Sequence, residues 1–404
     1  MATEAGAAYE VGPRLIDPLG VANDGLGFSV SAAPITSGGA YIAGGSVGTY
    51  VAIARLLPGA TVVQIEQRLE SGIANDSFGL AVALGGPEGE LLAIGAPADD
   101  SFGLNTGRVY LYRRPAVGGM YALMATVNPP APAETGNFGT AVAISADGSR
   151  LATGEPKAQQ ANIELGAVHV YDLSGPSISA PTTLYSDLGT GGRFGQSLVI
   201  DGNRIVVGAP LADDPAMVMD TGALRVLTLV GGLSFEGPPL YADDRANGDR
   251  LGLSVALSGD VLIGGAGNDD KPAGIEAGSA YVFRRNGSWQ QEAKLRSTQA
   301  QAQERFGQAV AVHGTEILVG AYCLNASGCI GAGAVYVYQF DGSQWLSQTR
   351  LTATDGANFG HALSYARDQL FAVGAFGSNG AFTGQGALYV AYPADGYFAD
   401  GFEN

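Results

Sequence analysis

The chain has 404 residues, of which 46% are hydrophobic and only 15% are charged, so it can bury a large core and is not a disordered acidic protein. Its net charge of −17 arises from 21 basic and 38 acidic side chains. An acidic protein repels phosphate backbones, which argues against nucleic-acid binding. No apolar run approaches the ~18 residues that cross a bilayer as a helix, so we expect no membrane span.

One sequence pattern recurs seven times along the chain. Each copy opens with an aromatic residue or leucine followed by glycine: Leu26-Gly27, Phe78-Gly79, Phe138-Gly139, Phe194-Gly195, Leu251-Gly252, Phe306-Gly307 and Phe359-Gly360. A second apolar run ends near a glycine in each copy: Gly44, Gly95, Gly154, Gly208, Gly264, Gly320 and Gly374. A third run follows a further glycine: Gly48, Gly107, Gly166, Gly222, Gly278, Gly333 and Gly386. Such recurrence indicates a repeat architecture rather than separate domains.

Each copy predicts four antiparallel strands. In the first run, as in residues 78–84 (FGLAVAL), side chains alternate across a sheet, and turns such as Asp201-Gly202 suit a short hairpin. The second run, as in residues 205–208 (IVVG), is continuously apolar, which is typical of a strand covered on both faces. Seven such sheets predict an all-β protein, a seven-bladed β-propeller of four-stranded blades. We expect one domain over residues 1–392, a tail over 393–404, and a monomer.

The ends of the chain predict how the ring closes. Residues 13–27 (PRLIDPLGVANDGLG) repeat the pattern of residues 66–79 (EQRLESGIANDSFG), which marks residues of about 9 to 16 as a fourth strand. No blade precedes this segment, so we expect it to complete the last blade. The alternative is a C-terminal fourth strand that begins at Tyr397-Phe398, after the turn Asp395-Gly396.

The repeats resemble a known family. Phe78-Gly79 with Gly95-Ala96-Pro97, and Phe194-Gly195 with Gly208-Ala209-Pro210, resemble the FG-GAP repeat of the integrin α-subunit propeller. The resemblance extends over about residues 9 to 392 and is similar to bacterial members in which Asp-Asp follows the GAP triplet. It implies the propeller fold but only a broad function, because members include adhesion ectodomains, lectin-like binders and accessory domains on enzymes.

The integrin members carry Asp-rich calcium loops between the first and second strands of several blades. Here that connection is a short turn, and no D-x-[DN]-x-[DN]-G run occurs in the sequence. Calcium requires six to eight oxygen ligands, and these short turns offer too few. We therefore expect no resident metal ion and no cofactor.

The resemblance also implies that the loops joining strands 2 and 3 and strands 4 and 1 share one face of the ring, which we call the loop face. Paired acids lie in three of the 2–3 loops: Asp99, Asp100, Asp213, Asp214, Asp269 and Asp270. They either attract a basic partner or a cation, or each caps its own turn. Three loop aromatics are candidates for stacking on a sugar: Phe102, Phe376 and Phe382. The 2–3 loop of the first blade is the shortest, which predicts a notch above that blade.

Localisation depends on weaker signals. Cys323 and Cys329 have a spacing that suits a local disulfide, although two unrelated buried thiols are the alternative. A disulfide would indicate an oxidising compartment. Residues 1–4 begin no signal peptide, so the protein is either cytoplasmic or has lost such a peptide. Because residues 397–404 resemble the C-terminal endings of some exported proteobacterial proteins, we expect an extracytoplasmic or secreted protein.

No catalytic constellation emerges from the sequence. His169, His313 and His361 lie apart, and no G-x-S-x-G elbow lies between a strand and a helix. We expect a non-enzymatic, exported binding or adhesion module for a protein or glycan ligand. The alternative is a polysaccharide-acting hydrolase or a lectin that uses the acidic and aromatic residues of the same face. Hydrolysis would need two carboxyl groups ~5 to 9.5 Å apart.

Overall fold

The computed structural model describes residues 9–12, 14–36, 38–57, 64–175, 177–270, 276–299, 302–322, 333–354, 358–367 and 369–394. Strands and loops make up these residues. No helix among them is long and apolar enough to cross a membrane.

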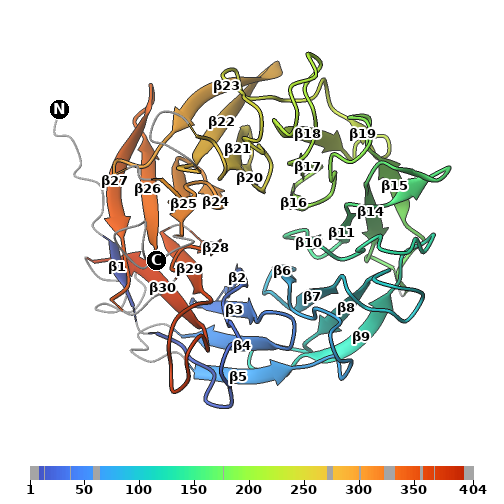
Figure 1. Ribbon diagram of the computed structural model, residues 1–404. Coiled ribbons are helices and arrows are strands. Elements are labelled where there is room, and N and C mark those ends of the chain that lie inside the picture. The colour runs from blue at the N-terminus through green and yellow to red at the C-terminus, as the bar shows by residue number, and fades with distance from the viewer. Residues whose placement is uncertain are drawn as a thin grey trace.

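Seven four-stranded antiparallel sheets, the blades, form the ring (Figure 1). Blades one to three consist of β2 (Ser29–Pro34), β3 (Ala40–Gly45), β4 (Val51–Leu56) and β5 (Gln64–Leu69); β6 (Ala81–Gly85), β7 (Leu91–Ala96), β8 (Arg108–Arg113) and β9 (Ala122–Val127); and β10 (Ala141–Ile144), β11 (Arg150–Glu155), β14 (Ala167–Asp172) and β15 (Thr182–Tyr185). Blades four and five consist of β16 (Ser197–Asp201), β17 (Arg204–Ala209), β18 (Ala223–Thr228) and β19 (Ser234–Phe235); and β20 (Ser254–Ser258), β21 (Val261–Ala266), β22 (Ser279–Asn286) and β23 (Ser288–Leu295). Blades six and seven consist of β24 (Ala309–His313), β25 (Glu316–Ala321), β26 (Ala334–Phe340) and β27 (Trp345–Leu351); and β28 (Ala362–Arg367), β29 (Leu370–Ala375), β30 (Ala387–Pro393) and β1 (Tyr9–Val11). The predicted seven-bladed propeller is confirmed.

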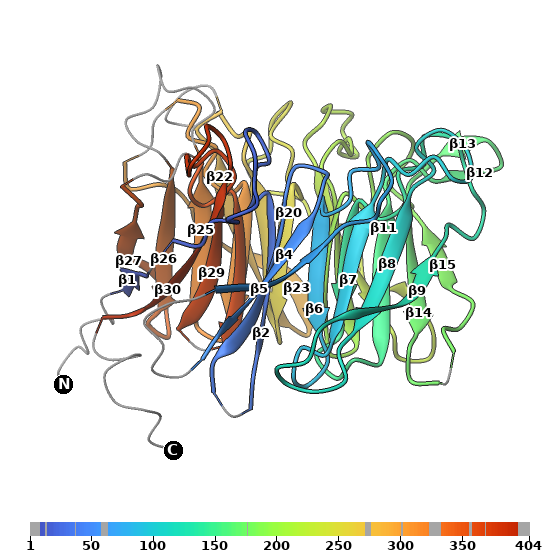
Figure 2. The same cartoon turned by 90° about the horizontal axis from the view of Figure 1, so that it is seen from below.

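The first strand of each blade lies nearest the axis and the fourth lies at the rim (Figure 1). Because strands alternate in direction, the 2–3 and 4–1 loops emerge on one face and the 1–2 and 3–4 turns on the other. In the side view, the loop face also carries the small hairpin of β12 (Gln159–Gln160) and β13 (Ile163–Glu164), which belongs to the 2–3 loop of blade three (Figure 2).

The recurring glycines allow neighbouring blades to approach each other closely. The glycine after each opening residue donates its N–H to the carbonyl of the glycine that ends the second run of its own blade, as Gly139 does to Gly154 at 3.0 Å. The same geometry recurs in all seven blades, at 2.9–3.1 Å. A Cβ added to Gly95 would lie well inside van der Waals contact of the Gly139 carbonyl oxygen in the next blade. Only glycine therefore allows the blade backbones to approach this closely.

In blades one and five the contact position lies one residue after the glycine named from the sequence. Gly27 donates to Gly45, and Gly252 donates to Gly265, so these residues rather than Gly44 and Gly264 occupy the contact position. In each case the sequence has two glycines in succession. The second one faces the next blade, because a Cβ on Gly45 would collide with the Gly79 carbonyl oxygen and one on Gly265 with that of Gly307.

The third-run glycine predicted for blade one, Gly48, also differs from its counterparts. The other six glycines of this set each form a parallel bridge with the opening residue of the next blade, as Gly107 does with Phe138. Gly48 lies instead inside a short loop that the side chain of Ser46 fixes, because Ser46 Oγ accepts the N–H groups of Thr49 and Tyr50.

The opening aromatic rings are fully buried between blades, as Phe78, Phe138 and Phe194 show at 0% exposure.

The predicted closure by the N-terminal segment is confirmed. β1 pairs antiparallel with β30, with Tyr9 opposite Pro393 and Val11 opposite Ala391, so a blue strand lies beside a red one in Figure 1. Leu15 continues the contact through an antiparallel bridge to Leu388. The competing C-terminal segment at Tyr397-Phe398 lies outside the described residues, and β1 occupies the edge of β30 where it would have paired.

Candidate functional site

The paired acids of the loop face have internal partners. Asp99 is completely buried, its Oδ1 accepts the N–H of Ser101 at 2.8 Å, and its Oδ2 lies 3.5 Å from Arg108. Asp269 holds the same position in blade five, where its Oδ2 accepts the Tyr281 hydroxyl at 3.0 Å and lies 2.5 Å from Lys294 Nζ. Both carboxylates are buried within their own blades.

The exposed acid of each pair closes its own loop. Asp100, Asp213 and Asp270 are exposed and accept backbone N–H groups five to seven residues further along the chain. Asp214 is buried, accepts two N–H groups of its loop, and pairs with Arg245 at 2.8 Å. Five of the six aspartates therefore accept N–H groups of their own loops, which favours the interpretation that they cap their turns, whereas Asp269 pairs with side chains of its blade.

The three loop aromatics do not gather into one platform. Phe102 and Phe382 are each 50% exposed and belong to the 2–3 loops of blades two and seven. Phe376 is half-buried and packs against His361 and Phe28, with ring centroids 4.5 and 5.7 Å away. Cys323 and Cys329, the candidate disulfide, lie outside the described residues.

The 2–3 loop of blade one is short, as predicted, and comprises only residues 46–50 between β3 and β4. A segment of the long connection from blade seven packs onto it, since the N–H of Val47 donates to the Asp24 carbonyl at 2.8 Å. The same connection is anchored to the rim by Asp17, whose carboxylate lies 2.5 Å from Arg68. The notch above blade one stays a prediction.

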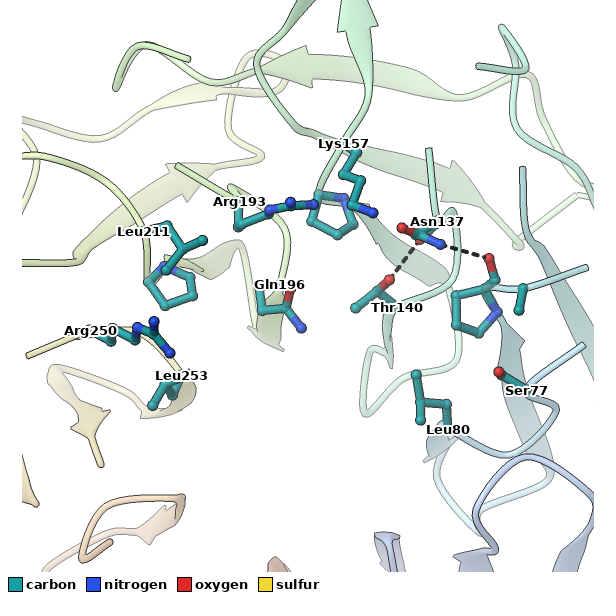
Figure 3. A pocket seen from close by; sticks show the side chains of 14 residues that line it. Ser77, Leu80, Asn137, Thr140, Lys157, Arg193, Gln196, Leu211, Arg250 and Leu253 are labelled. Carbon is teal, nitrogen blue, oxygen red and sulfur yellow. Dashed lines mark hydrogen bonds between the residues drawn. The ribbon is translucent and has the colours of Figure 1, made fainter. Parts of the chain in front are cut away.

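A pocket of about 430 Å³ opens on the loop face over blades two to five (Figure 3). Three repeat positions supply its lining. The residues before the opening motif are Ser77, Asn137, Arg193 and Arg250; those after it are Leu80, Thr140, Gln196 and Leu253; and those around the end of the GAP triplet are Pro97, Ala98, Pro156, Lys157, Pro210 and Leu211. The pocket is thus a product of the repeat, with a different side-chain set in each blade.

Backbone geometry explains why these side chains converge. The residue before the opening motif has a left-handed conformation in each of the four blades, with φ from 58° to 60°. This turn ends the 4–1 loop, and the following phenylalanine or leucine inserts between blades. Because the turn repeats, successive side chains project around one hollow, as the arc of sticks in Figure 3 shows.

The pocket is cationic, although the protein is acidic. Lys157, Arg193 and Arg250 line it, and none of its lining residues is acidic. Arg193 Nη1 lies 3.8 Å from Glu164 Oε1, which is a long and weak contact. Arg250 Nε is buried and has no hydrogen-bond partner within the described part of the chain. Such an arrangement can bind an anion, because the guanidinium and ammonium groups are donors that few protein acceptors occupy.

Lys157, Arg193 and Arg250 form what we call the basic arc. The sequence interpretation missed it because it considered the acids of the loops and did not compare residues at the same position of each repeat. Aligning the residue before each opening motif places Arg193, Arg250 and Arg305 in three consecutive blades. This recurrence of arginine at one repeat position was the sequence signal that could have indicated the two arginines of the pocket. The sequence also gave no sign that His169 is buried and bonded to Glu155 at 2.9 Å, the residue in place of the GAP alanine of blade three.

The aromatic cluster around His361 predicts a pH dependence. Burial lowers the pKa of His361 to about 4, although its Nδ1–H donates to the Phe28 carbonyl at 2.9 Å, which acts in the opposite direction. A lowered pKa in the folded state means that the unfolded chain binds the proton more readily. Stability is therefore fully present above about pH 6.5 and is lost as the pH falls towards 4, by at most about 3 kcal/mol.

The measurement is urea denaturation between pH 7 and pH 4 for the wild type and for His361→Gln. The carboxylates titrate in both proteins, so the difference between the two curves of stability against pH isolates the contribution of His361. We expect the wild type to lose more stability than the variant over this range. Parallel curves would contradict the assignment.

The comparisons with known proteins agree with the repeat. The sequence model of the FG-GAP repeat matches residues 70–112, 184–226, 239–283 and 289–338, each of which contains a 4–1 loop and the strands that follow. No curated protein matches the chain. The same glycine contacts recur in blades one, three and seven, beyond the matched stretches. Four of the seven blades, two, four, five and six, therefore match the FG-GAP repeat.

Proposed function

We propose that the protein is a non-enzymatic binding module whose ligand enters the pocket on the loop face. The observation that carries this proposal is the pocket itself, which combines apolar walls with convergent amide, hydroxyl and cationic groups from four blades. Its volume lies within the ~300 to 1,000 Å³ that small-ligand sites occupy. An exported adhesion or glycan-binding role is consistent with the family and with this face.

The alternative of a polysaccharide hydrolase receives less support. General acid–base chemistry on a glycoside needs two accessible carboxyl groups on either side of a substrate. Asp99, Asp214 and Asp269 are instead buried and partnered, and the lining of the pocket contains no carboxylate. The burial and internal partners of Asp99, Asp214 and Asp269 support a structural role for these three acids.

A glycan array tests the proposal when it is probed with the wild type and with Gln196→Trp. Gln196 lines the pocket, so an indole there fills the space without removing a charge. We expect the wild type to bind a restricted set of glycans and the variant to lose that binding by at least about tenfold, or ~1.4 kcal/mol. Gln344→Trp is the matched control, because Gln344 is exposed in the turn between β26 and β27 on the opposite face.

Two outcomes would overturn the proposal. The first is array binding that Gln196→Trp leaves unchanged, which would place the site elsewhere. The second is release of product from any glycan that a single Asp→Asn substitution abolishes, which would make the protein an enzyme.

A further inference from the structure

We propose that the ligand of this pocket is a compact organic anion, a sugar acid or a molecule of similar size that carries a carboxylate, sulfate or phosphate group. The inference rests on the proposed function, because it assumes that the pocket is the binding site. It adds the chemical class of the ligand. Its basis is the contrast between the charge of the pocket and the charge of the chain.

The first step is the local excess of positive charge. The chain has 38 acidic and 21 basic side chains, so a random surface hollow would contain more carboxylates than cations. This one contains Lys157, Arg193 and Arg250 and no acidic lining residue. Low-dielectric walls strengthen the field of such a cluster inside a concave site.

The second step is a comparison within the molecule. Arg305 occupies the same repeat position as Arg193 and Arg250, one blade further on. Its Nη2 lies 2.9 Å from Glu276 Oε2, and its Nη1 donates to the Tyr322 hydroxyl at 3.3 Å. At Arg305 the charge is neutralised by a partner within the fold.

Arg250 shows no such neutralisation. No ion pair of its side chain occurs among the residues that the structure describes, and its Nε is buried without an acceptor. An unpaired buried donor on a charged group is costly. An oxyanion in the pocket would pair with the guanidinium of Arg250, which lines the pocket, as Glu276 pairs with that of Arg305.

The third step is the remaining lining. Leu80, Leu211 and Leu253 form apolar walls, and the Gln196 amide is a donor and acceptor at the same wall. The Asn137 side-chain amide already donates to the Pro97 carbonyl at 3.2 Å, and the Thr140 hydroxyl to the Asn137 carbonyl at 2.7 Å. The fit is therefore to one acidic group bound by the basic arc and a small body held by van der Waals contact and a few hydrogen bonds.

The test is isothermal titration at low ionic strength with D-glucuronate, with D-glucose as the neutral probe and with sodium sulfate as a competitor. We expect glucuronate to bind at least about tenfold more tightly than glucose, since each factor of ten is ~1.4 kcal/mol. Sulfate should compete, because it presents the same oxyanion to the same donors.

The decisive variant is the double substitution Lys157→Gln with Arg250→Gln, which removes two charges from the pocket. We expect it to weaken glucuronate binding by at least about tenfold. The control is Arg113→Gln with Arg150→Gln, which makes the same charge change at the end of blades two and three away from the loop face and should leave affinity within about twofold. Thermal melts confirm that both variants fold.

Equal binding of glucose and glucuronate, or an unchanged affinity in the double variant, would overturn the anionic class. So would the absence of binding by both glucuronate and sulfate. None of these results touches the proposed function if Gln196→Trp still abolishes binding on the glycan array. Conversely, array binding that Gln196→Trp leaves unaffected removes the pocket and the proposed function together.

Discussion

Replacement of Gly95 by alanine is expected to destabilise the protein by about 3 kcal/mol or more, the upper end of the cost of overpacking a close-packed interior. The new Cβ would collide with the carbonyl oxygen of Gly139, so blades two and three would have to separate. Backbone strain is not the cause, because Gly95 does not have a positive φ. The measurement is the free energy of unfolding from urea titration.

Gly175→Ala is the matched control. Gly175 lies in the loop after β14, has no positive φ, and a Cβ there would meet only ordinary van der Waals contact at 3.5 Å. We expect this substitution to change stability by less than about 1 kcal/mol. Equal effects of the two substitutions would show that the close approach of the blades is not what selects glycine.

Deletion of residues 1–12 is expected to destabilise the protein by about 3 kcal/mol or more, because it removes β1 and opens the ring. Tyr9 is 9% exposed, its ring packs 5.4 Å from Phe371, and its hydroxyl donates to Glu316 at 2.6 Å. The deletion also exposes the edge of β30, and an unpaired strand edge promotes aggregation. Urea denaturation and light scattering measure the two effects.

Deletion of residues 397–404 is the control, and it should leave the denaturation midpoint nearly unchanged. Tyr9→Ala separates packing from pairing, because β1 is retained while the buried ring is lost. If the C-terminal deletion is the one that abolishes cooperative unfolding, closure by the N-terminal strand is wrong.

The fold could be predicted from the sequence because local and global signals agree at every repeat. Alternation in the first strand, the apolar second strand and glycine at each close approach all specify the same blade. The duplicated signature at residues 13–27 even identified the strand that closes the ring. Where two glycines are adjacent, as at Gly44-Gly45, the choice between them depends on a contact with another blade, here with the Gly79 carbonyl, which no local pattern contains.

The candidate site was less predictable, for a physical reason. An aspartate in a loop has the same sequence signature whether it caps a turn or faces a ligand, and Asp99 and Asp269 proved to be buried within their blades. The pocket residues come from four blades and from positions far apart in the chain, such as Ser77 and Leu253. Their proximity follows from the ring, so they could be grouped only by comparing repeats position by position.

The most direct measurement of the central claim is anomalous X-ray diffraction from crystals soaked in sodium selenate, a tetrahedral dianion that is visible at the selenium edge. The account predicts a selenium peak inside the pocket, within hydrogen-bonding distance of Arg250 and of Lys157 or Arg193, and its loss in the Lys157→Gln, Arg250→Gln variant. Peaks confined to exposed basic residues outside the pocket, or a pocket peak that persists in the variant, would contradict it.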